Sequence, residues 1–238
     1  MTENGPYAGA DDAAGPSAGA DPPGRTIHGV IDLLGVLSYA LLVAFFRLVE
    51  DAALAESLAD KAALAEMAVA EFAHFQLLRA KLQELNVDPD EAMRPFVAAI
   101  DEFHARTKPS DWLESLAKAY VGDGMAIDFC NSVAQVLDPQ TGEIVLELLK
   151  DTGHAQFAAA RLREAIDADP AVAGRLALWA RRLIGEALGQ AQRVAAERPD
   201  LAALLAGEKV AQLGEIGRMF ARLTDAQARR MAAVGLGD

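Results

Sequence analysis

Apolar residues recur at steps of three and four over most of the chain, which is the period of an amphipathic helix. In the segment from about Ile27 to Leu58, one face carries Ile31, Leu34, Ser38, Leu41, Phe45 and Leu48. In the segment from about Lys61 to Leu85, the stripe consists of Leu64, Met67, Glu71, His74 or Phe75, and Leu78. The pattern therefore predicts two long, consecutive helices, each with one face turned toward a core.

Capping residues and prolines divide the rest of the chain. We expect Asp60 to cap the second helix and Ser110 to cap a third long helix that reaches about Leu137. The remaining predicted helices are a short connection from about Asp90 to Arg106, a fourth long helix over 140–167, a fifth over 170–198 and a last one over 210–233. Almost no segment is a credible strand.

This layout predicts an all-α fold: a four-helix bundle with an extra connecting helix and a C-terminal helix pair. Apolar residues make up 52% of the 238 residues, which is enough for a sizeable core. Residues 1–24 are mainly Ala, Gly, Pro and Asp, and we expect a disordered tail there. The helical domain is predicted to span residues 25–238.

Composition narrows the class of partner and the compartment. The formal net charge is −13, so we expect no non-specific binding to nucleic acid. A single cysteine, Cys130, excludes an internal disulfide and fits the cytoplasm, and residues 1–24 have neither a basic side chain nor an apolar stretch typical of a signal peptide.

The most apolar run, from Leu33 to Phe46, has 14 residues and is shorter than the roughly 20 that a membrane span needs. We therefore expect a buried core helix there and no membrane association, and a homo-oligomer stays open.

Two acid-x-x-His pairs carry the candidate chemistry. Glu71 and His74 lie on the second predicted helix, and Asp151 and His154 on the fourth. Residues three apart share a helix face, so each pair would present a carboxylate and an imidazole to one point. Facing helices of this kind form carboxylate-bridged di-iron or di-manganese sites. The alternative is that both histidines are core residues paired with carboxylates of their own helices.

A third pair with the same spacing, Asp101 and His104, lies in the short connecting helix. We interpret it as a chance match, because it is not on a bundle helix. Tyr39 and Tyr120 are close to the predicted site in sequence, and we expect helix packing to be their main role. Cys130 is expected to be a small core residue.

The chain resembles the ferritin-like superfamily, and within it the bacterial proteins similar to the tRNA hydroxylase that acts on 2-methylthio-isopentenyladenosine. The resemblance rests on Glu71-Phe72-Ala73-His74-Phe75, on Ala119-Tyr120-Val121-Gly122-Asp123-Gly124 and on Asp151-Thr152-Gly153-His154. Complete members carry a Glu on the first helix, Glu-x-x-His on the second and fourth, and an acid on the third. They use two irons to activate dioxygen for hydroxylation.

Residue by residue, the resemblance implies metal ligands at Glu71, His74, Asp123, Asp151 and His154, with Asp128 as the second choice for the third helix. The first-helix acid would fall at Leu41, and no acid lies between Asp32 and Glu50. A two-ion centre would then lack one carboxylate to balance its charge, which is costly in an apolar bundle.

Two hypotheses follow from this departure. The first is a metal-dependent oxidoreductase similar to the hydroxylases, with one or two irons, or with Mn or Zn, acting on a small molecule or a modified nucleoside. The alternative is a non-catalytic bundle with a degenerate metal site, which binds a small ligand or a protein partner.

Overall fold

A computed structural model describes residues 23–148, 153–206 and 212–237. Within these ranges the chain forms helices and no strand, so the all-α prediction is confirmed. The predicted tail, residues 1–24, lies outside the described residues except for Pro23 and Gly24, which begin the first helix. The helices are α1 (Pro23–Ala52), α2 (Leu58–Glu84), α3 (Pro89–Met93), α4 (Val97–Arg106), α5 (Trp112–Ala134), α6 (Pro139–Glu147), α7 (His154–Ala168), α8 (Ala171–Glu197), α9 (Pro199–Ala206) and α10 (Gln212–Ala233).

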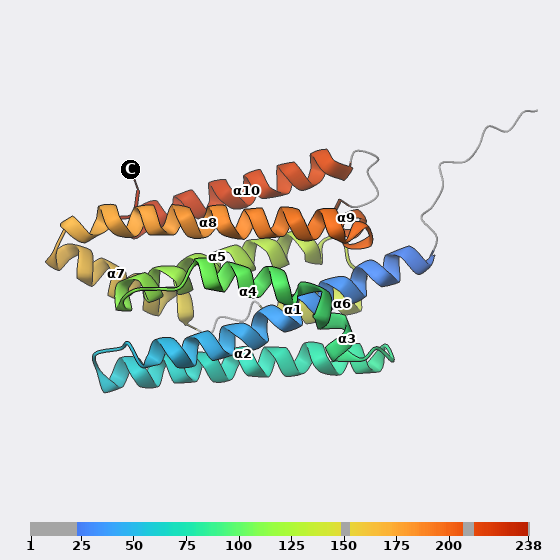
Figure 1. Ribbon diagram of the computed structural model, residues 1–238, viewed down its shortest axis with the longest axis horizontal. Helices are drawn as coiled ribbons and strands as arrows, with labels where there is room; N and C mark the ends of the chain where they lie inside the picture. The colour runs from blue at the N-terminus through green and yellow to red at the C-terminus, as the bar shows by residue number, and fades with distance from the viewer. Residues whose placement is uncertain (1–22, 149–152, 207–211, 238) are drawn as a thin grey trace, which may run out of the picture.

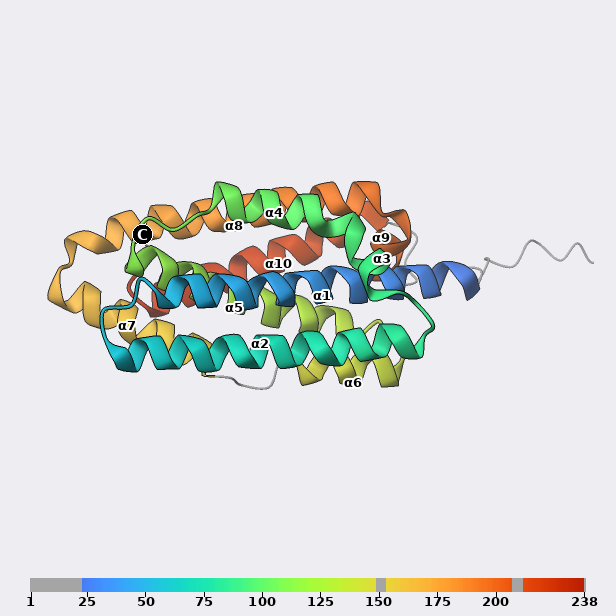
Figure 2. The ribbon, with the colours of Figure 1, turned by 60° about the horizontal axis from the view of Figure 1, so that its bottom comes forward.

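The long helices run side by side in a bundle. The α1–α2 hairpin forms one side, α8 and α10 form the other, and α4 and α5 lie between them (Figure 1). Figure 2 shows α1 and α2 aligned along most of their length, and the two helices pack closely. Between α5, α7, α8 and α10 a core is built on Leu116, Leu162, Leu176 and Leu183. A second core, around Leu33, Leu78 and Phe96, joins α1 and α2 to α9.

Helix α1 meets the length and hydropathy test for a membrane span over Ile27–Ala52. The core helix of a soluble protein meets the same test, so meeting it is weak evidence for a membrane span. Leu33, Leu34 and Val43 of α1 are buried, and the helix packs against α2, α3 and α9. One apolar face of α1 is therefore covered by protein, as expected for a core helix, while Phe46 and Val49 of the same helix are exposed.

Two predicted caps are wrong by a few residues. Ser57, not Asp60, caps α2, because its hydroxyl accepts a hydrogen bond from the Asp60 amide at 3.0 Å. Asp111, not Ser110, caps α5, where its carboxylate accepts from the Glu114 amide at 2.9 Å. In both cases a good capping residue lies beside the predicted one, so sequence alone cannot choose between them.

The predicted connecting helix is three pieces: α3, a 3₁₀ turn at Arg94–Phe96, and α4. Pro95 explains the break, since proline has no amide hydrogen and crowds the preceding turn of an α-helix. The turn lets α4 run back beside α1 and α8. This path brings a residue of α4 into the candidate site.

The predicted fourth long helix is also wrong, because α6 and α7 are separate. Gly153, directly before α7, has a φ of +77°, a left-handed conformation that ends any continuous right-handed helix. Asp151 lies outside the described residues, so its predicted position on one helix face with His154 stays a prediction. The short α9, which packs on α1, was not predicted; it begins at Pro199.

Candidate functional site

A partly open cavity of about 300 Å³ lies inside the bundle, between α1, α4 and α5. Glu71 enters its wall from α2, and Asp123 enters from α5. The structure therefore brings together two of the five predicted ligand residues. Much of the remaining wall is apolar, and small residues of α1 and α5 leave the space open. These are Ala40, Ala44, Ala119, Gly122 and Ala126.

Leu41 lines the same cavity as Glu71 and Asp123. This is the α1 position where the resemblance places a carboxylate. A leucine side chain offers no lone pair to a metal ion and adds apolar surface instead. The departure inferred from the sequence thus falls inside the candidate site.

The two carboxylates influence each other across the cavity. Burial raises the pKa of Glu71, and the charge of Asp123 raises it further, to about 7. A carboxyl group in this state exchanges its proton near neutral pH. Asp123 also lies close enough to Arg230 for its charge to raise the pKa of that guanidinium.

His74 is half-buried on α2 and is not part of the cavity wall. Burial lowers the pKa of its imidazole, and the charge of Glu147, the last residue of α6, partly opposes that shift. The imidazole is therefore neutral at pH 7 and has a carboxylate nearby on another element. A neutral imidazole is the form that binds metals.

Asp151 lies outside the described residues, and His154 is the first residue of α7, with no side-chain position described. Their part in a metal site stays a prediction. Among the described residues, no group of three or more His, Cys, Asp or Glu side chains is placed to hold a metal ion.

Asp128, the second choice for a third-helix ligand, has a structural role instead. Its carboxylate accepts two hydrogen bonds from Arg230 of α10, at 2.7 Å and 2.5 Å. The pair is partly buried and fixes α10 against α5. Asp123 lines the cavity and Asp128 does not, which favours Asp123 over Asp128 as the candidate ligand.

One end of the cavity is polar, and sequence reasoning missed it. Arg47 and Asp51 of α1, His104 of α4 and Lys118 of α5 line this end. The same four residues also line a neighbouring hollow of about 270 Å³. They therefore form a partition between the two spaces, which we call the polar partition.

His104 belongs to the acid-x-x-His spacing that we interpret as a chance match. Asp101, the acid of that spacing, accepts a hydrogen bond from Tyr39 at 2.8 Å, which agrees with this interpretation. His104 nevertheless reaches the cavity because α4 turns back along α1. A signal was present in the sequence: Lys118 stands alone within the apolar run Leu116-Ala117-Lys118-Ala119.

The remaining candidates have packing roles. The Tyr120 hydroxyl donates to the Arg230 carbonyl oxygen at 3.0 Å, between α5 and α10. Cys130 is buried as expected, and burial raises the pKa of its thiol to about 12, so it is not a reactive thiolate. Phe46, the last residue of the most apolar run, is not buried: its side chain has an exposed fraction of 54%.

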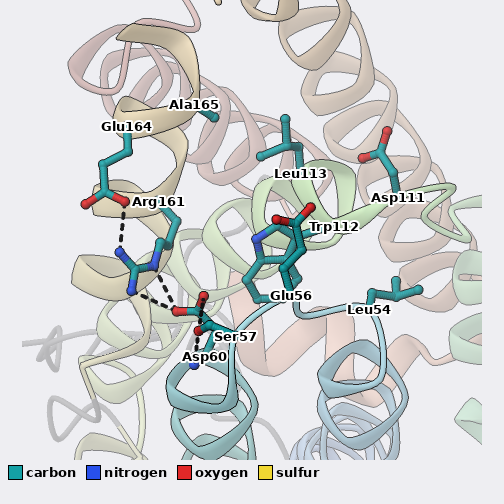
Figure 3. A pocket seen from close by; sticks show the side chains of 10 residues that line it. All are labelled: Leu54, Glu56, Ser57, Asp60, Asp111, Trp112, Leu113, Arg161, Glu164 and Ala165. Atoms are coloured by element: carbon teal, nitrogen blue, oxygen red, sulfur yellow. Dashed lines mark hydrogen bonds and ion pairs between the residues drawn. The ribbon is translucent and has the colours of Figure 1, made fainter. Parts of the chain in front are cut away.

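A larger hollow, of about 800 Å³, opens on the surface where the α1–α2 turn meets α5 and α7. Figure 3 shows Arg161 between Asp60 and Glu164, with both carboxylates within 2.9 Å of the guanidinium. These charges are already paired, and none of the predicted ligand residues lies here. The internal cavity is therefore the stronger site.

The fold and cavity define a class: an all-α bundle of long helices in which carboxylates of two helices face one internal space. The family described as a ferritin-like domain of actinomycetes matches residues 24–208, which covers α1 through α9. Because that is most of the chain, the protein belongs to this ferritin-like family. No curated protein matches the chain.

Proposed function

We propose that this protein binds a small, mainly apolar molecule in the internal cavity and does not assemble a two-metal centre. One observation carries the proposal: Leu41 lines the cavity at the position of the missing first-helix ligand. Ligand pockets are typically concave, mostly apolar and furnished with a few polar groups. At about 300 Å³ the cavity is at the small end of that range.

The described residues do not fit two ions. Two ferrous ions carry a charge of +4, and the acidic residues that line the cavity are Asp51, Glu71 and Asp123. Asp51 lies near the cations Lys118 and Arg47, whose charge it balances, and Asp128 is engaged by Arg230. With Asp151 added to Glu71 and Asp123, a two-ion centre would still leave positive charge uncompensated in a largely apolar interior, which is costly.

Cavity-filling variants test the proposal. The neutral probe N-phenyl-1-naphthylamine, which fluoresces in apolar sites, is titrated into the purified protein. We expect saturable binding that Leu41→Trp abolishes and that Leu77→Trp, at an exposed position of α2, preserves. Gly122→Leu is a second filling variant, since a Cβ added at Gly122 meets nothing within 4 Å. Unchanged binding by both folded filling variants would overturn the proposal.

A second candidate function is a metal-dependent oxidoreductase similar to the hydroxylases. The observation that favours it is the convergence of Glu71 and Asp123 from two different helices, since a cation would relieve their repulsion. One ion of iron, manganese or zinc would be held by Glu71 and Asp123, with His74, Asp151 and His154 as the predicted further ligands. Such an ion would supply activation of dioxygen or peroxide. A modified-nucleoside substrate rests on the resemblance alone.

Metal analysis separates the two candidates. Protein purified from iron-replete medium is analysed for Fe, Mn and Zn, and we expect substantially less than one ion per chain. Two irons per chain would contradict the proposal despite Leu41. About one ion, lost in a His74→Ala, His154→Ala double variant, would instead support the second candidate.

Leu41→Glu, compared with Leu42→Glu, tests whether a restored carboxylate increases metal content. A cytoplasmic location suits either candidate and is part of the proposal.

A further inference from the structure

We infer that the cavity takes an amphipathic molecule with one anionic group, such as a medium-chain carboxylate. The polar partition would hold the anionic head, and the space beside Leu41 would hold the apolar tail. This inference rests on the proposed function, because it requires that the cavity bind a small molecule.

The geometry provides two ends of different character. Away from the polar partition, the cavity wall includes Leu37, Leu41 and Ile127 together with the two carboxyl groups described above. On the other side of the polar partition, the neighbouring hollow is lined by Glu50, Lys108 and Pro109 as well as by the partition residues. A ligand lying along this line would place its tail against the apolar side chains and its head at the polar partition.

The polar partition contains two buried hydrogen-bonding nitrogens that lack a partner among the described residues. They are Nε of Arg47 and Nδ1 of His104. A buried donor without an acceptor loses its hydrogen bond to water and gains none in return, which is costly. Arg47 Nε can only donate, and a neutral histidine can carry its proton on Nδ1. A carboxylate head would accept from both nitrogens.

Lys118 supplies a third donor. Its ammonium donates one hydrogen bond to the Thr107 carbonyl oxygen at 2.7 Å and lies 5.4 Å from the centre of the Phe103 ring. An ammonium has three hydrogens, so others remain to contact a ligand. Burial is the main reason that the pKa of Lys118 is lowered, to about 8, and a bound anion would favour its charged form.

The polar partition carries two cationic side chains, Arg47 and Lys118, and one carboxylate, Asp51, which favours an anion over a cation. Glu50 lines only the neighbouring hollow and is paired with Arg47 at 2.6 Å. Burial raises the pKa of Asp51, and a hydrogen bond with Ser115 partly opposes this. At His104 the charged groups that lower the imidazole pKa are Lys118 and Arg47, after burial itself.

The cavity volume limits the tail. A volume of about 300 Å³ holds roughly ten groups of the size of a water molecule, at about 30 Å³ each. The expected ligand is thus an alkyl chain of roughly eight to ten carbons, or a compact ring system of similar volume. Chains of fourteen carbons would not fit within this space.

Calorimetric titration at pH 7.5, below micelle formation, tests the inference with three ten-carbon probes: decanoate, 1-decanol and decyltrimethylammonium. We expect decanoate to bind at least tenfold more tightly than 1-decanol, with the ammonium compound the weakest. Arg47→Met and Lys118→Met should reduce decanoate affinity to the level of 1-decanol without changing 1-decanol binding. Arg94→Met, at an exposed position of the 3₁₀ turn, serves as the matched control. Within a series from hexanoate to tetradecanoate, affinity should peak near decanoate.

The failure of this inference is distinguishable from failure of the proposed function. Equal affinity for decanoate and 1-decanol, or full decanoate binding by a folded Lys118→Met or Lys118→Gln variant, would overturn the anionic head while leaving the apolar site intact. If N-phenyl-1-naphthylamine binds but no alkyl probe does, the inference fails alone. If neither class of probe binds, both fail. Circular dichroism establishes that each variant is folded.

Discussion

Glu71 is the residue whose environment most affects its chemistry. Its carboxyl has a folded-state pKa of about 7, against an ordinary value of 4.5, because burial and Asp123 disfavour the charge. Between these two values the folded protein holds a proton that the unfolded chain has lost. The free energy of unfolding therefore falls as pH rises from about 4.5 to 7 and stays lowered above that.

The variant Glu71→Gln should remove this pH dependence. We expect it to be more stable than the wild type by about 1–2 kcal/mol at pH 8 and equal to it at pH 4, because glutamine has no charge to bury. Urea denaturation in EDTA across that range measures the difference. Glu66→Gln, exposed on the same helix, should change nothing. An unchanged slope in Glu71→Gln would show that Glu71 titrates normally.

At the scale of elements, close approach of helices depends on two glycines. A Cβ added at Gly35 of α1 would lie 2.2 Å from the Ala92 carbonyl oxygen of α3. A Cβ added at Gly124 of α5 would lie 2.7 Å from the side-chain oxygen Oε1 of Gln227 in α10. Glycine near the middle of α5 weakens that helix in isolation. Gly124 nevertheless has a role in packing, because its lack of a side chain allows α10 to dock against α5.

Two glycine substitutions of opposite expected sign test this packing. Gly35→Ala should lower the free energy of unfolding by about 1–3 kcal/mol, because α1 and α3 would have to move apart. Gly185→Ala, on an exposed face of α8 with nothing within 4 Å of the new Cβ, should raise it by about 0.5–1 kcal/mol. Thermal and urea denaturation measure both. Equal effects would mean that α1 and α3 are not in close contact.

The docking of α10 also depends on the Asp128–Arg230 pair. Asp128→Asn should lower the free energy of unfolding by about 1–3 kcal/mol, because two charge-assisted hydrogen bonds are weakened. Probe binding in the cavity should stay unchanged, which separates Asp128 from Asp123. Asp225→Asn, exposed on α10, should lie within about 0.5 kcal/mol of the wild type. Loss of probe binding in Asp128→Asn would show that this residue supports the cavity.

At the scale of the whole molecule, charge determines which large partners can approach. The net charge of −13 opposes a phosphate backbone at long range. We expect fluorescence anisotropy with bulk tRNA at 0.15 M salt to give a Kd weaker than about 10⁻⁴ M. A basic protein of similar size provides the positive control. Micromolar binding with a steep salt dependence would contradict this and would support a nucleic-acid substrate.

Sequence periodicity alone was enough to predict the all-α bundle and the core faces of α1 and α2, because a 3.6-residue repeat is a local property of the chain. The acid-x-x-His spacing identified Glu71, and the family resemblance added Asp123 and Leu41; the structure places all three around one cavity. Local pattern failed at Gly153, where a left-handed residue divides one predicted helix into α6 and α7.

Only the tertiary structure determined the polar end of the site. Arg47, His104 and Lys118 come from three helices, and no spacing along the chain links them. Their convergence depends on Pro95 breaking the connecting helix so that α4 turns back along α1, a path that follows from packing rather than from any local repeat. The amphipathic period is a property of each segment's own sequence. The meeting of side chains from distant segments depends instead on how the helices bury their apolar faces together.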